Sequence, residues 1–243
     1  VGNDEASRIY VNLKEKAAEK IGIGFRKIEL DENVSQEEVL KVISGLNADG
    51  DVHGIIVQLP LPNQLDKIAV IQAIDPKKDV DGFHDENIEK FFAGQERFFP
   101  VFPLAIMDLV KSSEENLENK SASIICNSQE FGKTMQAALE REKISAQYFF
   151  SDDVQDGMVD LKESDIVISA CGKPDLLSGE MLKSGAIVVD GGITRVGDKV
   201  VGDVNLSSVQ NMEGFISPVP GGVGPVTIAC LLRNVYLASK KSL

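Results

Sequence analysis

The sequence predicts an α/β fold of two domains, each built around mainly parallel strands. Strand-like apolar runs alternate with helix-like segments along the whole chain, which is typical of this fold class. The run Gly54-Ile-Ile-Val-Gln-Leu59 is almost continuously apolar, as buried parallel strands are. Four later strand-like runs follow, with helix-like segments between the first three. This alternation of strands and helices is typical of a doubly wound sheet. The four runs cover residues 122–126, 146–150, 165–170 and 186–190.

The N-terminal part is expected to begin with a helix over residues 4–21, for which Asp4 is a candidate N-cap. Ser35 is a second candidate cap, because two acidic residues follow it at the start of a helical pattern. The elements expected after the first helix are a strand over 25–30, a helix over 35–46, a strand over 54–59, a helix over 65–74 and a loop over 75–84.

The first four residues, Val1-Gly2-Asn3-Asp4, resemble the end of a strand followed by a turn. A parallel sheet that begins on a helix leaves one strand position unfilled. We therefore expect a helix and a strand to precede this sequence in the natural protein.

The second part is expected to begin with a helix over residues 104–112 and to end with a helix that starts near Pro225. We divide the chain into residues 1–103, completed by the C-terminal helix 225–243, and residues 104–224. The second domain is predicted to be Rossmann-like, with a parallel sheet.

Composition excludes several classes of function. The 243 residues carry a formal net charge of −13, which argues against nucleic acid or an anionic membrane as partner. No apolar run reaches the ~18 residues that a membrane span needs. Only His53 and His84 are histidines, so no multi-histidine metal site is expected. The three cysteines lie in apolar runs and fit buried thiols in a reducing, cytoplasmic compartment.

The loop Ser217-Pro-Val-Pro-Gly-Gly-Val-Gly-Pro-Val-Thr227 precedes the last helix. Its glycines allow backbone amides to approach a ligand closely, and the helix N-terminus favours an anionic or carbonyl-bearing group. The alternative is a rigid turn that binds nothing.

Several polar residues are candidates for chemistry. Ser7, Tyr10 and Lys14 share one helix face, so a flat ligand stacked on the tyrosine would have an ammonium beside it. Gln58 ends a buried strand at the edge where α/β sheets bind ligands. Each has a simpler interpretation: a solvated lysine beside a half-buried tyrosine, and an amide that caps a loop carbonyl.

The loop over 75–84 holds two further candidates, Asp79 and Asp81, which could accept hydrogen bonds from a ligand. They could equally form an Asx-turn that only orders the loop. His84 is expected to be a surface or structural histidine, since no nucleophile or metal ligand pairs with it.

Four blocks in register carry a family resemblance. They are Tyr10-Val-Asn-Leu-Lys14, Gly54-Ile-Ile-Val-Gln-Leu-Pro-Leu-Pro62, Lys78-Asp-Val-Asp-Gly-Phe83 and Pro218-Val-Pro-Gly-Gly-Val-Gly-Pro225. Together they resemble the bifunctional methylenetetrahydrofolate dehydrogenase/methenyltetrahydrofolate cyclohydrolase family. The resemblance covers essentially the whole chain, less the first helix and strand of the usual catalytic domain.

The resemblance implies a role for each of these residues. Tyr10 would stack on the p-aminobenzoyl ring of folate, and Lys14 would be the central group of the cyclohydrolase step. Gln58 would position Lys14, and Asp81 would hold the pteridine ring. The residues implied to contact substrate are Ser7, Tyr10, Asp81, Pro220 and Gly221, with the last two lying along both substrate and nicotinamide.

For the cofactor, the resemblance implies NADP, bound by the second domain. The residues implied to contact it are Asn127, Ser128, Gly132, Ser151, Cys171, Gly172, Ile193 and Gly222. The usual Gly-Arg-Ser turn is Cys126-Asn-Ser128 here, and Phe150-Ser-Asp-Asp153 replaces a basic segment. Acidic residues there would repel a 2′-phosphate and accept ribose hydroxyls, which favours NAD. Pro100-Val-Phe-Pro103 adds bulk near the expected nicotinamide.

The leading hypothesis is a bifunctional enzyme that oxidises 5,10-methylenetetrahydrofolate to the methenyl form and hydrolyses that to 10-formyltetrahydrofolate. The alternatives are a cyclohydrolase with impaired dehydrogenase activity and a non-catalytic folate-binding paralogue. An unrelated NAD-dependent dehydrogenase would leave the segment 58–62 unexplained. The resemblance also suggests a homodimer formed through the dinucleotide domain.

Overall fold

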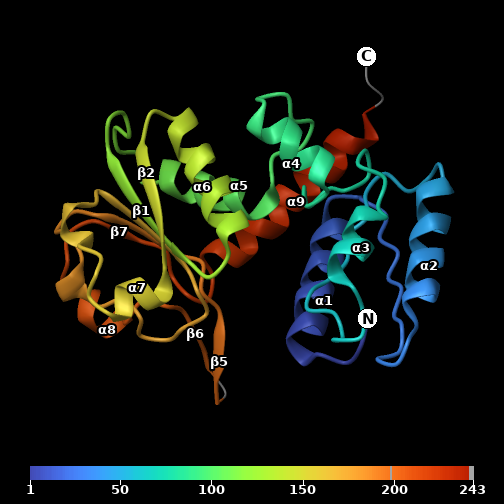
Figure 1. The fold of residues 1–243 in the computed structure, drawn as a ribbon, viewed down its shortest axis with the longest axis horizontal. Coiled ribbons are helices and arrows are strands. Elements are labelled where there is room, and N and C mark those ends of the chain that lie inside the picture. The colour runs from blue at the N-terminus through green and yellow to red at the C-terminus, as the bar shows by residue number, and fades with distance from the viewer. Residues whose placement is uncertain (198, 241–243) are drawn as a thin grey trace. The chain divides into compact units, whose positions relative to one another are not determined.

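In the computed structural model the chain divides into two units, Val1–Val101 with Ile228–Leu243, and Phe102–Thr227. The structure describes residues 1–197 and 199–240. Phe102, Pro103 and residues 225–227 thus belong to the second unit rather than to the first, where the sequence had placed them. Figure 1 shows the helices and strands of each unit.

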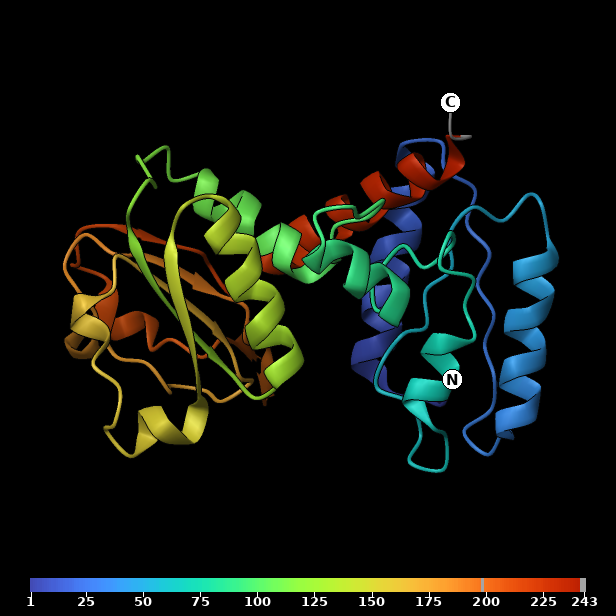
Figure 2. The same ribbon diagram turned by 45° about the horizontal axis from the view of Figure 1, so that its top comes forward.

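The first unit is built from helices joined by extended segments (Figures 1 and 2). Its helices are α1 (Glu5–Lys20), α2 (Gln36–Ala48), α3 (Lys67–Gln72), α4 (Asp85–Phe92) and the greater part of α9 (Val223–Ser239). Both predicted caps are confirmed: Asp4 accepts a 2.7 Å hydrogen bond from the Ser7 amide, and Ser35 accepts one of 3.2 Å from the Glu38 amide. Each cap satisfies an amide that has no partner within its helix.

The predicted strands over 25–30 and 54–59 are wrong as strands, although both segments are extended. A strand requires a ladder of hydrogen bonds to a neighbour. Among the described residues, the backbone bonds between elements here are Gly2 N to Leu30 O and Ile55 N to Lys78 O, with one parallel bridge between Ile55 and Asp79. Apolar side chains of the second segment, Ile55 and Val57, still pack into the core between α2 and α3.

The second unit contains a five-stranded, entirely parallel sheet in the order β2-β1-β3-β4-β7. Its strands are β1 (Ser121–Cys126), β2 (Ser145–Phe150), β3 (Ile166–Ala170), β4 (Ile187–Asp190) and β7 (Phe215–Ile216). The first four confirm the predicted runs, whereas β7 and the antiparallel hairpin β5 (Thr194–Val196) and β6 (Lys199–Val201) were not predicted.

Helices and two 3₁₀ turns connect these strands. They are α5 (Val101–Lys111), α6 (Gln129–Arg141), α7 (Ser151–Gln155), η1 (Leu161–Glu163), η2 (Gly179–Met181) and α8 (Leu206–Val209). Helix α6 packs on β1 and β2 (Figures 1 and 2). Helix α5 begins earlier than predicted, because Pro103 fits its first turn and does not exclude the two residues before it.

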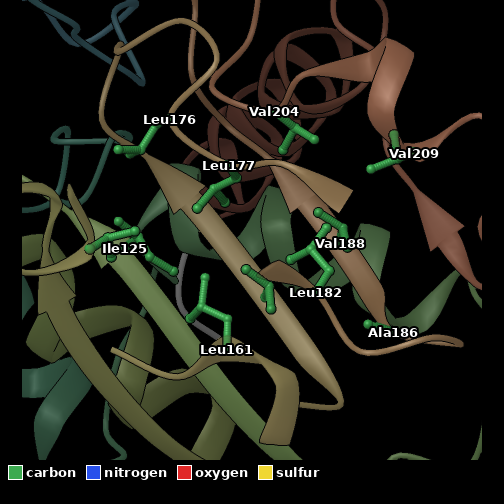
Figure 3. Packing of buried hydrophobic residues seen from close by; sticks show 11 residues of the cluster. Ile125, Leu161, Leu176, Leu177, Leu182, Ala186, Val188, Val204 and Val209 are labelled. Carbon is green, nitrogen blue, oxygen red and sulfur yellow. The ribbon is translucent and has the colours of Figure 1, made fainter. Parts of the chain in front are cut away.

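The core of the second unit lies against the sheet. Ile125 of β1 and Val188 of β4 lie with Leu161, Leu177 and other apolar side chains from the connections (Figure 3). Val167 of β3 belongs to the same buried cluster. Buried apolar area of this kind provides most of the free energy of folding. The core therefore fixes the strands whose carboxyl ends carry the predicted cofactor residues.

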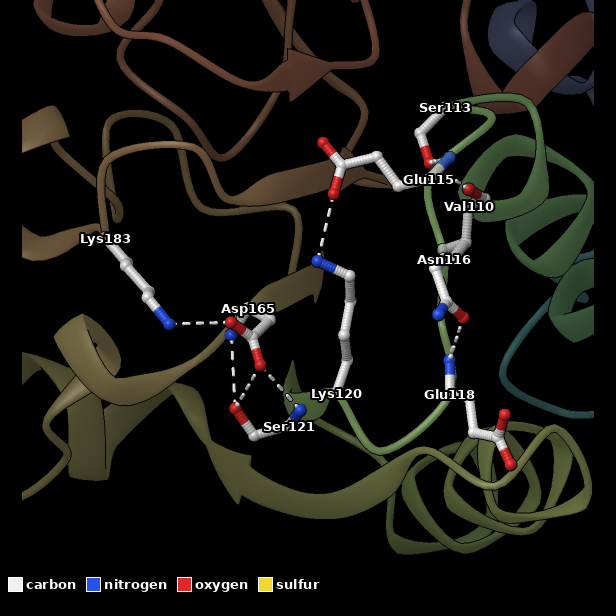
Figure 4. A network of polar contacts seen from close by, with 9 residues as sticks. All are labelled: Val110, Ser113, Glu115, Asn116, Glu118, Lys120, Ser121, Asp165 and Lys183. Atoms are coloured by element: carbon white, nitrogen blue, oxygen red, sulfur yellow. Dashed lines mark hydrogen bonds and ion pairs between the residues drawn. The ribbon is translucent and has the colours of Figure 1, made fainter.

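A polar network fixes the amino end of the same sheet (Figure 4). Asp165, just before β3, accepts hydrogen bonds from the Ser121 amide at 2.9 Å and from Lys183 Nζ at 2.6 Å. These bonds hold the Asp165 pKa at about 2, Lys183 having the larger effect. The carboxylate thus joins the beginnings of β1 and β3.

Among the described residues, none of the helices combines the length and the apolar character that a membrane span requires.

Candidate active site

Helix α1 carries three of the predicted site residues. Ser7, Tyr10 and Lys14 are all partly buried, and their spacing places them on one helix face. Ser7 Oγ donates a 3.3 Å hydrogen bond to the carbonyl oxygen of Leu59. Burial raises the pKa of the Tyr10 phenol, so this side chain stays neutral and offers a flat uncharged ring.

Lys14 and Gln58 are in direct contact. Lys14 Nζ donates a 3.0 Å hydrogen bond to Gln58 Oε1, while Gln58 Nε2 donates to the Leu59 carbonyl at 2.8 Å. The amide therefore caps a loop carbonyl and also binds the ammonium. Burial lowers the pKa of Lys14, and the charge of Asp81 opposes this effect. The lysine can exchange its proton closer to neutral pH than an exposed lysine can.

Asp81 lies in the loop between α3 and α4. Burial raises the pKa of its carboxyl to about 6, although the charge of Lys14 acts in the opposite direction. The neighbouring charge of Asp79 adds to the rise. Asp81 therefore changes its protonation state close to physiological pH, as groups at functional sites often do.

Asp79 orders the loop that carries Asp81. Its carboxylate is buried and accepts hydrogen bonds from the amides of Gly82 at 3.2 Å and His84 at 2.8 Å, and from Asn87 Nδ2 at 2.9 Å. This confirms the loop-ordering interpretation of Asp79. His84 is structural as predicted, because its Nδ1 accepts from the Glu86 amide at 3.1 Å and caps α4.

The glycine- and proline-rich loop before α9 is tightly folded. Ser217 is buried, and its Oγ accepts a 2.8 Å hydrogen bond from the last amide of β4. A Cβ atom on Gly222 would lie 2.4 Å from the Pro218 carbonyl oxygen, so only glycine fits there. Pro220 and Gly221 are exposed at the tip of the loop.

Three predicted cofactor residues form one chain of hydrogen bonds at the carboxyl edge of the sheet. Ser151 Oγ, at the start of α7, donates to Asn127 Oδ1 at 2.6 Å. Asn127 Nδ2 donates to the Cys171 carbonyl at 2.7 Å. The side chain of Asn127 thus ties together the ends of β1, β2 and β3, which parallel pairing already brings side by side.

The turn from β1 into α6 is closely packed around Cys126. Ser128 Oγ caps α6 by accepting from the Phe131 amide at 3.3 Å. Burial raises the pKa of the Cys126 thiol, which lies against the Ser128 carbonyl. A Cβ on Gly132 would lie 2.7 Å from the Tyr148 ring and 3.1 Å from Cys126 Sγ. The Cys126 side chain therefore fits in this turn, since Gly132 has no side chain to collide with it.

Phe102 occupies space at the same edge of the sheet. Its ring lies 5.2 Å from that of Phe131, centroid to centroid. Its Cζ would be 2.9 Å from a Cβ on Gly191, which follows β4. The Phe102 ring thus lies between the end of β4 and the start of α6.

The segments after β3 and β4 are linked as well. Thr194 Oγ1 donates to the Gly172 carbonyl at 3.0 Å, and Ile193 beside it is largely exposed. Lys173 Nζ forms a 2.7 Å ion pair with Asp152, whose side chain is 81% exposed.

Sequence reasoning missed two buried carboxylates as ordering groups. Asp203 accepts from Ser169 Oγ at 2.6 Å and from the amides of Cys171 and Lys173, both at 2.7 Å. Asp190 accepts from the amides of Gly192, Asp203 and Val204, and burial raises its pKa. The signal was present, since each aspartate stands beside glycine in a short motif.

The predicted residues therefore form two groups. The first unit holds Ser7, Tyr10, Lys14, Gln58 and Asp81, and the second holds the others. Within residues 1–197 and 199–240, no cluster of His, Cys, Asp and Glu side chains could hold a metal ion.

Two family models match the chain. Residues 1–81 match the tetrahydrofolate dehydrogenase/cyclohydrolase catalytic domain, and residues 100–243 match the NAD(P)-binding domain of the same family. The bifunctional protein FolD of Macrococcus caseolyticus is 43% identical over 242 residues, which is 100% of this chain and 86% of that protein. The FolD protein of Staphylococcus saprophyticus is 44% identical over 99% of this chain and 84% of its own length.

Solved structures agree with these matches. The bifunctional enzyme FolD from Campylobacter jejuni has a TM-score of 0.90 and 42% identity, covering 98% of this chain and 85% of that one. FolD from Trypanosoma brucei, solved with NADP and an inhibitor, has a TM-score of 0.92 and 34% identity, covering 98% and 83%. The chain belongs to the tetrahydrofolate dehydrogenase/cyclohydrolase family, and so is a nicotinamide-dinucleotide-dependent enzyme of folate one-carbon metabolism that acts as both methylenetetrahydrofolate dehydrogenase and methenyltetrahydrofolate cyclohydrolase.

Proposed function

We propose that Lys14 transfers the proton in the cyclohydrolase step, with Gln58 holding its ammonium and Asp81 binding the pteridine ring. The observation that carries this proposal is the 3.0 Å hydrogen bond between Lys14 Nζ and Gln58 Oε1 on a lysine whose pKa burial lowers. A buried lysine beside a neutral amide can act as a base near neutral pH, whereas an exposed lysine cannot.

Hydrolysis needs one proton moved twice. Water adds to the cationic carbon of the methenyl bridge and must lose a proton, and the ring nitrogen that departs must gain one. Neutral Lys14 accepts the first proton and, as an ammonium, returns it to the departing nitrogen. The remaining hydrogen of the added water is released to solvent as the carbonyl forms, so the products are 10-formyltetrahydrofolate and one proton. The positive charge of the substrate further favours neutral lysine, since like charges repel. Tyr10 supplies a flat neutral ring for the p-aminobenzoyl group, and Ser7 lies one turn away on the same face.

The second unit fits a nicotinamide dinucleotide. Helix α6 begins just after the exposed Asn127 and Ser128, beside the carboxyl ends of parallel strands, where dinucleotides bind in such sheets. Gly132 allows α6 to approach β2, because its missing side chain leaves room for the Tyr148 ring. When bound, the nicotinamide accepts the hydride that leaves the methylene bridge. Ser151, Cys171, Gly172, Ile193 and Gly222 are the further residues proposed to contact this cofactor, and Pro220 and Gly221 those proposed to contact substrate.

NAD is the proposed cofactor in preference to NADP. Of the two acidic residues after β2, Asp153 is used locally, since its carboxylate accepts from the Phe150 amide at 3.1 Å. Asp152 is exposed and remains able to accept ribose hydroxyls, and its charge repels a 2′-phosphate. Dehydrogenase assays with NAD and NADP in turn test this preference, and a higher kcat/KM with NADP would refute it.

The protein is further proposed to act as a homodimer in the cytoplasm. Cys126, Cys171 and Cys230 are thiols rather than disulfides in the part of the chain that the structure describes, which suits a reducing compartment. The dimer follows from the family resemblance alone. Light scattering on the purified protein tests it, and a monomer at micromolar concentration would count against it.

The central experiment compares methenyltetrahydrofolate hydrolysis by the natural sequence and by Lys14→Met. A fall of about 10²-fold or more is expected, because the proton-transfer group is removed. Lys16→Met is the matched control, since Lys16 is exposed on the same helix. Equal hydrolysis rates for the natural sequence and Lys14→Met would remove Lys14 from the mechanism, and thermal melting shows that the variants are folded.

A further inference from the structure

Asn234 is a buried polar residue of α9 that directly follows the exposed Arg233. Its side chain is 1% exposed. Its Nδ2 donates to the carbonyl oxygens of Val80 at 2.9 Å and Phe99 at 3.1 Å. A single amide therefore binds two segments that are far apart in the sequence.

Both segments adjoin Asp81. Val80 directly precedes it, and the amide of Val101 donates to the Asp81 carbonyl at 3.1 Å. Gly82 follows with a φ of +79°, and a Cβ there would lie 3.0 Å from the Pro100 Cα. The Asp81 carbonyl and Gly82 thus lie against the segment 99–101, and the Asn234 amide links Val80 to the same segment.

The contacts divide between the two sides of Asp81. Asp79 holds the amide of Gly82 after it, as described above. Asn234 holds the carbonyl of Val80 before it and also the carbonyl of Phe99. Removing the Asn234 amide would leave two carbonyls without this donor and would free the loop on that side.

We propose that Asn234 is a positioning residue that fixes the Asp81 carboxylate for folate binding. This inference rests on the proposed function of Asp81 as the pteridine-binding group. Asn234 itself acts only through the backbone. Its effect should therefore appear in the KM for the folate substrate, and only while Asp81 can bind that substrate.

A double-mutant cycle tests this role. The KM for 5,10-methenyltetrahydrofolate is measured in the natural sequence, Asn234→Leu, Asp81→Asn and the double variant. Asn234→Leu is expected to raise KM about tenfold alone and less than about twofold in the Asp81→Asn background, because coupled residues are not additive. An equal increase in both backgrounds, or no increase in either, would overturn the proposal.

A control separates positioning from loss of stability. Ile43→Ala opens a cavity in the core of the same unit, on α2, and should lower Tm while leaving KM unchanged. If Asn234→Leu does not fold, Asn234→Ser replaces it, since its hydroxyl is too short to reach both carbonyls. If Asp81→Asn has a normal KM, the proposed function of Asp81 fails. A raised KM in Asp81→Asn with a normal KM in the Asn234 variant refutes the positioning role alone.

Discussion

Lys14 Nζ donates a 3.0 Å hydrogen bond to Gln58 Oε1, although the two residues are 44 positions apart in the chain. The orientation of the amide is set at its other end, where Gln58 Nε2 donates to the Leu59 carbonyl. That carbonyl also accepts from Ser7 Oγ. The ammonium of Lys14 is thus directed by an amide that cannot rotate without losing a second bond.

Replacing Gln58 should change both the rate and the pH dependence of hydrolysis. Gln58→Leu removes the acceptor of the ammonium, and we expect cyclohydrolase kcat to fall about 10- to 100-fold. Gln58→Glu places a carboxylate beside Lys14 and raises its pKa. The pH at which neutral lysine forms then increases, so the acid limb of the pH–rate profile should move to higher pH.

Gln64→Leu serves as the control for these variants, because Gln64 is an exposed amide in the same unit and contacts the Glu32 carbonyl. Its pH–rate profile should match that of the natural sequence. A profile for Gln58→Glu that coincides with it would show that Gln58 does not influence Lys14.

Folate binding should weaken as pH falls through about 6, the pKa to which burial raises Asp81. Above this pH the carboxylate accepts hydrogen bonds from the pteridine ring, and below it the protonated form does so poorly. Asp79→Asn removes a negative charge that raises the pKa of Asp81. The rise in KM should therefore begin at lower pH in this variant, and an unchanged midpoint would contradict the assignment.

The sequence predicted the second unit more accurately than the first, for a physical reason. The runs at β1 to β4 are apolar and pair with one another along the sheet, so composition and pairing agree. The segment 54–59 is similarly apolar, and 25–30 has apolar residues among charged ones, but a strand also depends on a neighbour with which to form a ladder. Composition does not show whether that neighbour is present.

The residues of the candidate site also differ in how far the sequence could predict them. Tyr10, Lys14 and Asp81 were predictable because a helix face or a short motif places them together. Asn234 was missed, because a polar residue within a mainly apolar helix gives no indication of which carbonyls it binds. Asp203 was missed as an ordering group because its three donors come from a different part of the chain, around β3.

Two glycine-to-alanine substitutions should have opposite effects on stability. Gly132→Ala places a Cβ 2.7 Å from the Tyr148 ring and should lower the free energy of unfolding by about 1–3 kcal/mol. Gly45→Ala, inside α2, meets no atom within 4 Å and should raise it by about 0.5–1 kcal/mol. Urea unfolding measures both changes. An unchanged free energy of unfolding in Gly132→Ala would show that α6 can move away from β2 without cost.

The stabilisation that the Asp165 carboxylate provides should be lost in acid. Its pKa is held at about 2 in the folded state, chiefly by Lys183, against an ordinary 3.8. Because the folded pKa is the lower one, this stabilisation is complete above pH 3.8 and is lost as pH falls toward 2. Asp165→Asn should cost about 1–2 kcal/mol at pH 7, allowing for solvent screening, and the difference should shrink in acid.

Asp156→Asn is the control for Asp165, since Asp156 is exposed in the same unit. Its free energy of unfolding should follow that of the natural sequence at every pH. A cost for Asp165→Asn that stayed constant down to pH 2 would mean that packing, rather than charge, explains the effect.

Asp152 should set the cofactor preference through its ion pair with Lys173, whose Nζ lies 2.7 Å from the carboxylate. Asp152→Ser removes the repulsion of a 2′-phosphate and frees the ammonium to bind one. The ratio of kcat/KM for NADP to that for NAD should rise about tenfold, and this gain should decrease with added salt, because exposed charges are screened. Adding Lys173→Met should remove the part of the gain that the freed cation supplies. A gain that persisted in full in the double variant would attribute the preference to repulsion by Asp152 alone.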